Sequence, residues 1–84
     1  MVNVKICGLT RPCDIVAVNI ERPDYIGFVF AKSRRKVTLE QAFELRQMLH
    51  PDIIPVGVFV NETISRILSV VESGVIDAIQ LHGT

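Results

Sequence analysis

The chain has 84 residues, of which 49% are hydrophobic, and its nine Lys and Arg residues are balanced by nine Asp and Glu residues. This composition is too apolar for a disordered chain and fits one domain at most, while zero net charge gives no reason to expect nucleic acid or an anionic membrane surface as a partner. No apolar run reaches the roughly 18 residues that a membrane span needs, and the N-terminus lacks the layout of a signal peptide, so we expect a cytoplasmic protein.

The chain opens with a short apolar run, residues 2–7, whose composition predicts a strand. Gly8 interrupts the run, and Thr10 then stands where a helix N-cap is expected, with Pro12 tolerated in the first turn. We expect the apolar face of this first helix to comprise Ile15, Val16 and Ile20.

A second apolar run, residues 25–30, is followed by the basic loop 32–36, which is more typical of a solvated loop than of a nucleic-acid site. The sequence Thr38-Leu39-Glu40-Gln41 then has the pattern of a capping box, in which the Thr and Gln side chains satisfy backbone donors. This pattern predicts a second helix that starts after Thr38 and stops before Pro51. Its apolar positions at helical period are Leu39, Ala42, Phe43 and Leu49.

The third apolar run spans residues 53–60, and its proline, Pro55, fits the start of a strand better than the middle. Asn61 follows the run and is interpreted as the N-cap of a third helix. Gly74 is expected to end that helix in a left-handed conformation. One face of the helix has apolar residues at i, i+3, i+4 and i+7, namely Ile64, Ile67, Leu68 and Val71.

A fourth apolar run over residues 75–81 completes the predicted order β-α-β-α-β-α-β. The runs 25–30 and 53–60 are almost continuously apolar, which indicates strands buried on both faces, as in a parallel sheet. Two architectures fit this α/β pattern. One is an open flavodoxin-like sheet, and the other is part of a (β/α)8 barrel, which takes about 200 residues or more to close. Periodicity alone does not decide between them.

The last predicted strand has no helix after it to cover its edge. A complete open sheet would usually cover such an edge, because unpaired strand edges and exposed apolar faces associate with other chains. We therefore expect either self-association of residues 1–84 or a missing C-terminal half that completes the fold.

Five chemically capable side chains lie at or just after the ends of the four predicted strands. Cys7 ends the first run, Arg34 and Arg35 follow the second, Asn61 follows the third and His82 follows the fourth. In parallel α/β folds the working residues lie at the carboxyl ends of the strands, so these side chains are expected on one rim.

Each of these side chains also has a purely structural interpretation. Cys7 is either a small buried hydrophobe or a thiolate whose pKa is lowered by the helix that follows. Arg34 or Arg35 is either a solvated loop residue or a clamp for a carboxylate or phosphate. His82 is either a hydrogen-bonded side chain that orients a loop or a substrate contact. Both thiols should be free, because Cys7 and Cys13 are too few for a disulfide framework and have no metal-ligand partners at a suitable spacing.

A family resemblance is carried by four segments: Lys5-Ile6-Cys7-Gly8-Leu9-Thr10; Asp24-Tyr25-Ile26-Gly27-Phe28-Val29-Phe30 with Ser33-Arg34-Arg35; Val56-Gly57-Val58-Phe59-Val60-Asn61; and Ile79-Gln80-Leu81-His82-Gly83. In this order and at this spacing, they resemble the first four strands of phosphoribosylanthranilate isomerases. The resemblance spans the whole chain, and it implies that residues 1–84 are the N-terminal half of a (β/α)8 barrel.

The same resemblance implies an isomerase of tryptophan biosynthesis that uses no metal or organic cofactor. Its substrate is a small phosphorylated molecule, N-(5-phosphoribosyl)anthranilate, which an Amadori rearrangement converts to 1-(2-carboxyphenylamino)-1-deoxyribulose 5-phosphate. By resemblance, Cys7 is the general base, Arg35 binds the anthranilate carboxylate and His82 lines the same pocket.

Two parts of the family's site have no counterpart in residues 1–84. The general acid is an Asp on a later strand, which neither Asp52 nor Asp77 matches, and the phosphate site is built by the last two βα loops. We therefore expect the isolated chain to be inactive or nearly so. Three interpretations remain open: a truncated isomerase, a half-barrel that works with a separate C-terminal half, and a non-catalytic α/β binding or interaction module.

Overall fold

The computed structural model describes residues 4–82, which form four strands and three helices that alternate along the chain. Their bounds are β1 (Lys5–Cys7), α1 (Pro12–Glu21), β2 (Tyr25–Val29), α2 (Leu39–Met48), β3 (Ile54–Val60), α3 (Ile64–Glu72) and β4 (Ala78–His82). The predicted element order is confirmed. The fourth strand begins later than its apolar run, since Val75 and Ile76 are buried in the connection before it.

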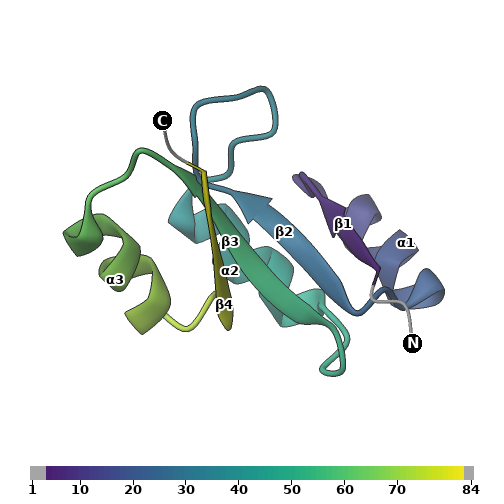
Figure 1. Ribbon diagram of the computed structural model, residues 1–84. Helices are drawn as coiled ribbons and strands as arrows, with labels where there is room; N and C mark the ends of the chain where they lie inside the picture. The colour runs from purple at the N-terminus through teal and green to yellow at the C-terminus, as the bar shows by residue number, and fades with distance from the viewer. Residues whose placement is uncertain (1–3, 83–84) are drawn as a thin grey trace.

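The four strands form one sheet in the order β1-β2-β3-β4, and every pair is parallel. All three helices contribute to one apolar core, with Ile15 from α1, Leu45 from α2 and Val70 from α3 packed together with strand residues such as Phe28 and Phe59. The helices therefore cover one face of the sheet, and within residues 4–82 the opposite face carries no helix (Figure 1).

This arrangement decides between the two architectures that the sequence left open. A flavodoxin-like sheet has a strand order that reverses and helices on both faces, whereas a (β/α)8 barrel adds each strand beside the last and keeps every helix outside. The observed sequential strand order with one helix-covered face is that of a barrel segment.

The second helix begins as the sequence predicted. Thr38 Oγ1 accepts a hydrogen bond from Gln41 N over 3.1 Å, and Gln41 Oε1 accepts one from Thr38 N over 2.8 Å. Gly74 likewise has the expected left-handed conformation, with φ of 81°, just after α3.

Two predicted N-caps are wrong. Arg11, not Thr10, is the N-cap of α1, because the Asp14 carboxylate accepts hydrogen bonds from the backbone N–H groups of both residues, over 3.0 and 3.1 Å. Thr63, not Asn61, is the N-cap of α3, where its hydroxyl accepts a hydrogen bond from Arg66 N.

The buried faces of the helices differ in part from those predicted. In α1 the buried residues are Ile15 and Val18. Val16 and Ile20, which were predicted to be buried, are 53% and 76% exposed. In α2, Leu45 is buried and Phe43 is half exposed.

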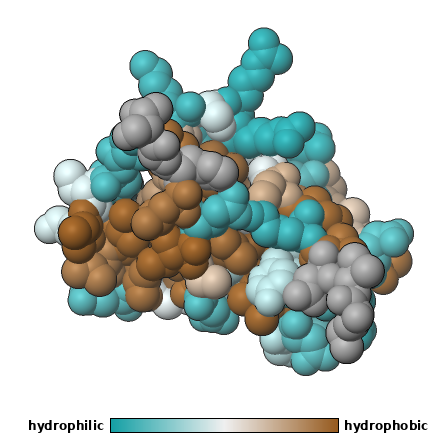
Figure 2. Space-filling view, viewed as in Figure 1, coloured by the Kyte–Doolittle hydropathy of each residue, from teal (hydrophilic) through white to brown (hydrophobic). Residues whose placement is uncertain are grey.

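The predicted buried face of α3 is also wrong in part. Val70 is buried and Ile67 packs against the core, while the rest of the predicted face is exposed, namely Ile64, Leu68 and Val71. A helical period identifies apolar stripes, but the position of the sheet determines which stripe is covered. Figure 2 shows the apolar surface that remains over the strands on the side away from α2.

Candidate functional site

The carboxyl ends of the four strands lie at one edge of the sheet, because all four are parallel. Cys7 is the last residue of β1 and His82 is the last residue of β4, where it pairs with Val60 of β3. The loop that carries Arg34 and Arg35 leaves β2 at the same edge (Figure 1). The predicted rim is therefore confirmed as an arrangement of backbone segments. The side chain of His82 lies outside the part of the chain that the structure describes.

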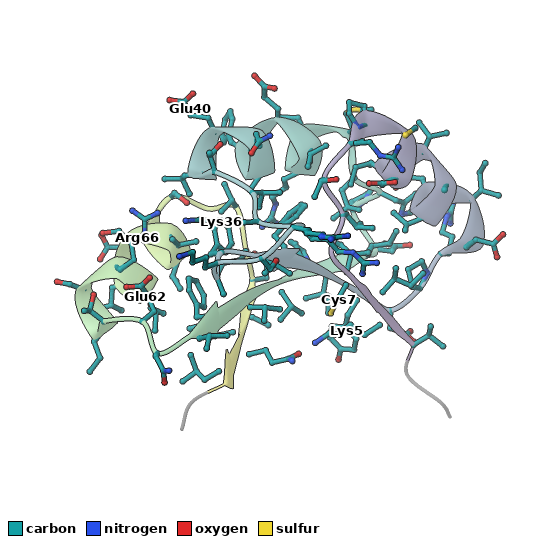
Figure 3. All side chains as sticks on the ribbon, turned by 90° about the horizontal axis from the view of Figure 1, so that it is seen from above. Lys5, Cys7, Lys36, Glu40, Glu62 and Arg66 are labelled. Carbon is teal, nitrogen blue, oxygen red and sulfur yellow. The ribbon has the colours of Figure 1, made fainter. Side chains whose placement is uncertain are left out.

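Cys7 is a free, exposed thiol. It pairs with Gly27 of β2, and it projects with Lys5 from the face of the sheet that carries no helix (Figure 3). The interpretation of Cys7 as a buried hydrophobe is wrong, because the helices cover only the other face. Cys13 is also free and exposed, in the first turn of α1.

The thiol of Cys7 lies against the backbone of Gly27. A Cβ atom built on Gly27 would be 2.7 Å from Cys7 Sγ and 3.3 Å from Cys7 Cβ, and real Cβ atoms essentially never come within 3.0 Å of another heavy atom. The backbone of Gly8 follows, with its N–H donating to Gly27 O over 2.9 Å. The strand end that carries the thiol is thus held on β2 through a glycine.

The loop after β2 is tied back to the strand, which fixes the backbone of Arg35. Ser33 Oγ accepts a hydrogen bond from Arg35 N over 3.1 Å, and Ser33 O accepts one from Lys36 N over 3.3 Å. Val37 N then donates to Val29 O over 2.9 Å at the end of β2. This compact turn presents Arg35 toward the end of β1.

The side chain of Arg35 crosses Gly8, the residue after Cys7. A Cβ atom on Gly8 would overlap with Arg35 Cδ and would lie 3.1 Å from Nη1 and 3.4 Å from Nε. The Arg35 side chain from the loop after β2 therefore lies against the residue that follows Cys7 at the end of β1. A guanidinium can bind an anion, and a thiol can exchange a proton.

Asp14 holds the connection between β1 and α1 in place. Its carboxylate accepts hydrogen bonds from Thr10 N and Arg11 N, and it forms an ion pair with the Arg11 guanidinium at 3.2 Å. The Thr10 hydrogen bond, followed by those from Arg11, lowers the pKa of the Asp14 carboxyl, although partial burial acts in the opposite direction. Asp14 therefore supports the first turn of this helix.

The described residues contain no group of three or more His, Cys, Asp or Glu side chains that could hold a metal ion. Within the same residues, no helix is both long and apolar enough to cross a membrane. A hollow of about 420 Å³ lies between α2 and the α3–β4 connection, with Glu40, Phe43 and Ser73 among its lining residues. Neither Cys7 nor Arg35 lines this hollow, so it is separate from the rim.

Sequence reasoning missed the two glycines of the rim, Gly8 and Gly27, as parts of the site. A signal for Gly27 was present, because a glycine inside a strand often marks the close approach of another group. The sequence did not say which group approaches.

Comparisons with known proteins agree with this geometry. Residues 4–84 match the family model described as N-(5'-phosphoribosyl)anthranilate (PRA) isomerase. An N-(5'-phosphoribosyl)anthranilate isomerase from Lacticaseibacillus casei is 55% identical over 83 residues, which cover 99% of this chain and 42% of that protein. The isomerase from Thermoanaerobacter sp. is 49% identical, with 99% and 41% covered. The chain therefore spans about 42% of the length of the curated relatives that it matches.

Solved structures give the same result. A phosphoribosylanthranilate isomerase in complex with reduced 1-(o-carboxyphenylamino)-1-deoxyribulose 5-phosphate superposes with a TM-score of 0.88 at 44% identity, covering 99% of this chain and 43% of that one. The crystal structure of TrpF from Jonesia denitrificans superposes with a TM-score of 0.91 at 34% identity, and the match covers 99% of this chain and 41% of that one.

Proposed function

Because the chain belongs to the N-(5'-phosphoribosyl)anthranilate isomerase family, we propose that residues 1–84 are the N-terminal half of its barrel and carry one half of its active site. The observation that supports this most directly is that Cys7 and the loop of Arg35 both lie at the carboxyl edge of a sequential parallel sheet, with the Arg35 side chain against Gly8, the residue after Cys7. Active sites of (β/α)8 barrels lie at that edge.

In the proposed reaction, the phosphoribosyl ring opens to a Schiff base, and a base then removes the proton from C2. The enolamine that results tautomerises to the ketone. Cys7, as the thiolate, would take the C2 proton, a role carried over from the family resemblance. The exposed position of its thiol supports this role, because a substrate can reach it from the helix-free side.

Arg35 would bind the carboxylate of the anthranilate group, for which a guanidinium offers two parallel N–H donors. His82, at the end of β4, would line the same pocket. A related isomerase has been solved with a ligand that contains both a carboxyphenyl group and a phosphate. The substrate proposed for this chain has the same two features.

The proposed general acid and phosphate site belong to the remainder of the barrel. We therefore propose that activity requires a C-terminal half that continues the sheet beyond β4. Exposed apolar residues at the two edge strands support such a continuation. They are Val4 and Ile6 at β1, and Ile79 and Leu81 in β4. A cytoplasmic location is part of this proposal, and the exposed free thiols of Cys7 and Cys13 fit a reducing compartment.

Complementation tests the proposal. Residues 1–84 are expressed in bacteria that lack this isomerase, on medium without tryptophan, either alone or as a full-length chimera. In the chimera, residues 1–84 replace the matching segment of the Lacticaseibacillus casei isomerase. We expect growth only with the chimera and loss of growth on Cys7→Ala.

Two outcomes would contradict the proposal. Growth with residues 1–84 alone would mean that the acid and the phosphate site lie within them. A soluble chimera that gives no growth would instead favour a non-catalytic α/β module.

A further inference from the structure

At the rim, two glycines each leave space for a neighbouring functional side chain. At Gly27, the missing Cβ would lie 2.7 Å from Cys7 Sγ. At Gly8, the missing Cβ would overlap with Arg35 Cδ. The group that a Cβ would displace is the proposed base at Gly27 and the exposed side chain of the proposed carboxylate clamp at Gly8.

The two glycines are also connected to each other. Gly27 pairs with Cys7 in the register of β1 and β2, and its carbonyl accepts the hydrogen bond from Gly8 N. The thiol, the guanidinium stem and both glycines therefore form one contact network across two strand ends. A methyl group at either glycine would shift one member of this network.

We propose that Gly8 and Gly27 are positioning residues of the isomerase, Gly27 for the Cys7 thiol and Gly8 for the Arg35 guanidinium. This inference rests on the proposed function, since it concerns the two side chains that would touch the substrate. Gly27→Ala forces the thiol off its place above the strand, and Gly8→Ala forces the guanidinium away from the end of β1. A displacement on the order of 1 Å in such a site lowers the rate by up to about 100-fold.

The chain offers a matched control for each glycine. Gly57 also lies within a strand, but its missing Cβ faces Ile76 and Phe59 in the core, on the opposite face of the sheet from the thiol. Gly74 has φ of 81°, close to the 85° of Gly8, and a Cβ there meets nothing within 4 Å. Gly57→Ala is therefore the control for Gly27→Ala, because it introduces a steric clash within a strand without touching the thiol. Gly74→Ala is the control for Gly8→Ala, because it introduces the same backbone strain without displacing a side chain.

The first experiment measures the position of the thiol without any catalysis. The full-length chimera is alkylated with iodoacetamide as a function of pH, and mass spectrometry of the peptides gives separate rates for Cys7 and Cys13. We expect Gly27→Ala to change the ratio of the two rates by roughly threefold or more, because only Cys7 is displaced. Gly57→Ala should leave the ratio unchanged.

A double-mutant cycle keeps this test decisive if Gly57→Ala does not fold. The fall in thermal midpoint caused by Gly27→Ala is measured with Cys7 present and in the Cys7→Ala background. We expect a smaller fall without the sulfur atom, since the closest contact is then removed. Equal falls together with an unchanged alkylation ratio would overturn the role of Gly27, whether or not the chimera is an isomerase.

The second experiment separates the two glycines by their kinetics. Gly8→Ala should raise KM for the carboxylated substrate by roughly tenfold or more, because the guanidinium that binds the carboxylate has moved. Gly27→Ala should lower kcat by a similar factor. Gly74→Ala should change neither. If Gly8→Ala behaves like Gly74→Ala, the role of Gly8 is overturned, while activity of the unchanged chimera shows that the proposed function still holds.

Discussion

The guanidinium of Arg46 donates two hydrogen bonds to the carboxylate of Asp77, from Nη1 to Oδ1 over 3.0 Å and from Nη2 to Oδ2 over 2.9 Å. This pair joins the last turn of α2 to the connection before β4. Asp77 therefore lies at the amino end of its strand, the edge opposite to Cys7. In barrels, residues at that edge act in stability and those at the carboxyl edge in catalysis.

Asp77→Asn should lower the stability of the full-length chimera by about 0.5–1 kcal/mol, because a partly solvated but bidentate pair is lost. The two side chains are 29% and 53% exposed, so solvent screening keeps the effect small. Urea unfolding in low and high salt measures it, and the difference between variants should shrink in high salt. A loss of kcat in Asp77→Asn with stability retained would contradict this structural role.

Cys7→Ala should lower kcat/KM of the chimera by about 10²–10⁴-fold, since it removes the proposed general base. The thiol is exposed, so the midpoint of thermal unfolding should change little. Cys13→Ala removes the other exposed thiol, in α1, and serves as the matched control. Steady-state kinetics of both variants check the prediction, which fails if Cys13→Ala is the more damaging change.

Arg35→Lys should raise KM roughly tenfold or more and change kcat less, because a lysine keeps the charge but loses the two parallel donors. Arg34→Lys, one residue earlier in the same exposed loop, should leave KM near its original value. An unchanged KM in Arg35→Lys would show that the loop acts through its charge alone, and an equal rise in KM at both positions would show that Arg35 has no special role.

The parts of the fold that depend on neighbouring residues could be predicted from the sequence. The capping box of Thr38 and Gln41 formed because both partners lie within one turn. The predicted caps Thr10 and Asn61 were wrong because a nearby side chain is the acceptor instead. That side chain is Asp14 at the start of α1 and Thr63 at the start of α3. A choice between adjacent polar residues depends on where the helix begins, and the sheet sets that point.

The rim could be predicted because parallel strands bring their carboxyl ends together whatever the side chains are. The contacts of Arg35 with Gly8 and of Cys7 with Gly27 could not, because they join residues far apart in sequence through the register of β1 and β2. The prediction of the buried helix faces was partly wrong for a similar reason. Several stripes of α1 and α3 are apolar, and only the position of the sheet selects one.

Residues 1–84 on their own should self-associate, because large apolar side chains are exposed on α3, with Ile64 at 76% and Leu68 at 50%. Leu68→Lys together with Ile64→Lys should shift the isolated chain toward the monomer in size-exclusion chromatography with light scattering. Glu72→Lys, on the same helix, changes the charge without removing apolar surface and is the control. A compact monomer before any substitution would contradict the prediction.

The hydrogen bonds that Asp14 accepts should make stability depend on pH in the acid range. Its pKa is lowered in the folded state, first by the hydrogen bond from Thr10 and then by those from Arg11. The carboxylate therefore stabilises the fold fully above its ordinary pKa of 3.8, and this contribution is lost as the pH falls through the lowered value.

Asp14→Ala should thus destabilise the chimera by about 1 kcal/mol near neutral pH, the usual effect of losing an acceptor at a helix start. The difference from the unchanged chimera should shrink steadily below the ordinary pKa. Asp52→Ala, an exposed carboxylate in the connection before β3, should show a much smaller difference at neutral pH. Urea unfolding of the three proteins across the acid range measures both. A difference for Asp14→Ala that grows as the pH falls would mean that the carboxyl is more basic in the fold, contrary to its observed hydrogen bonds.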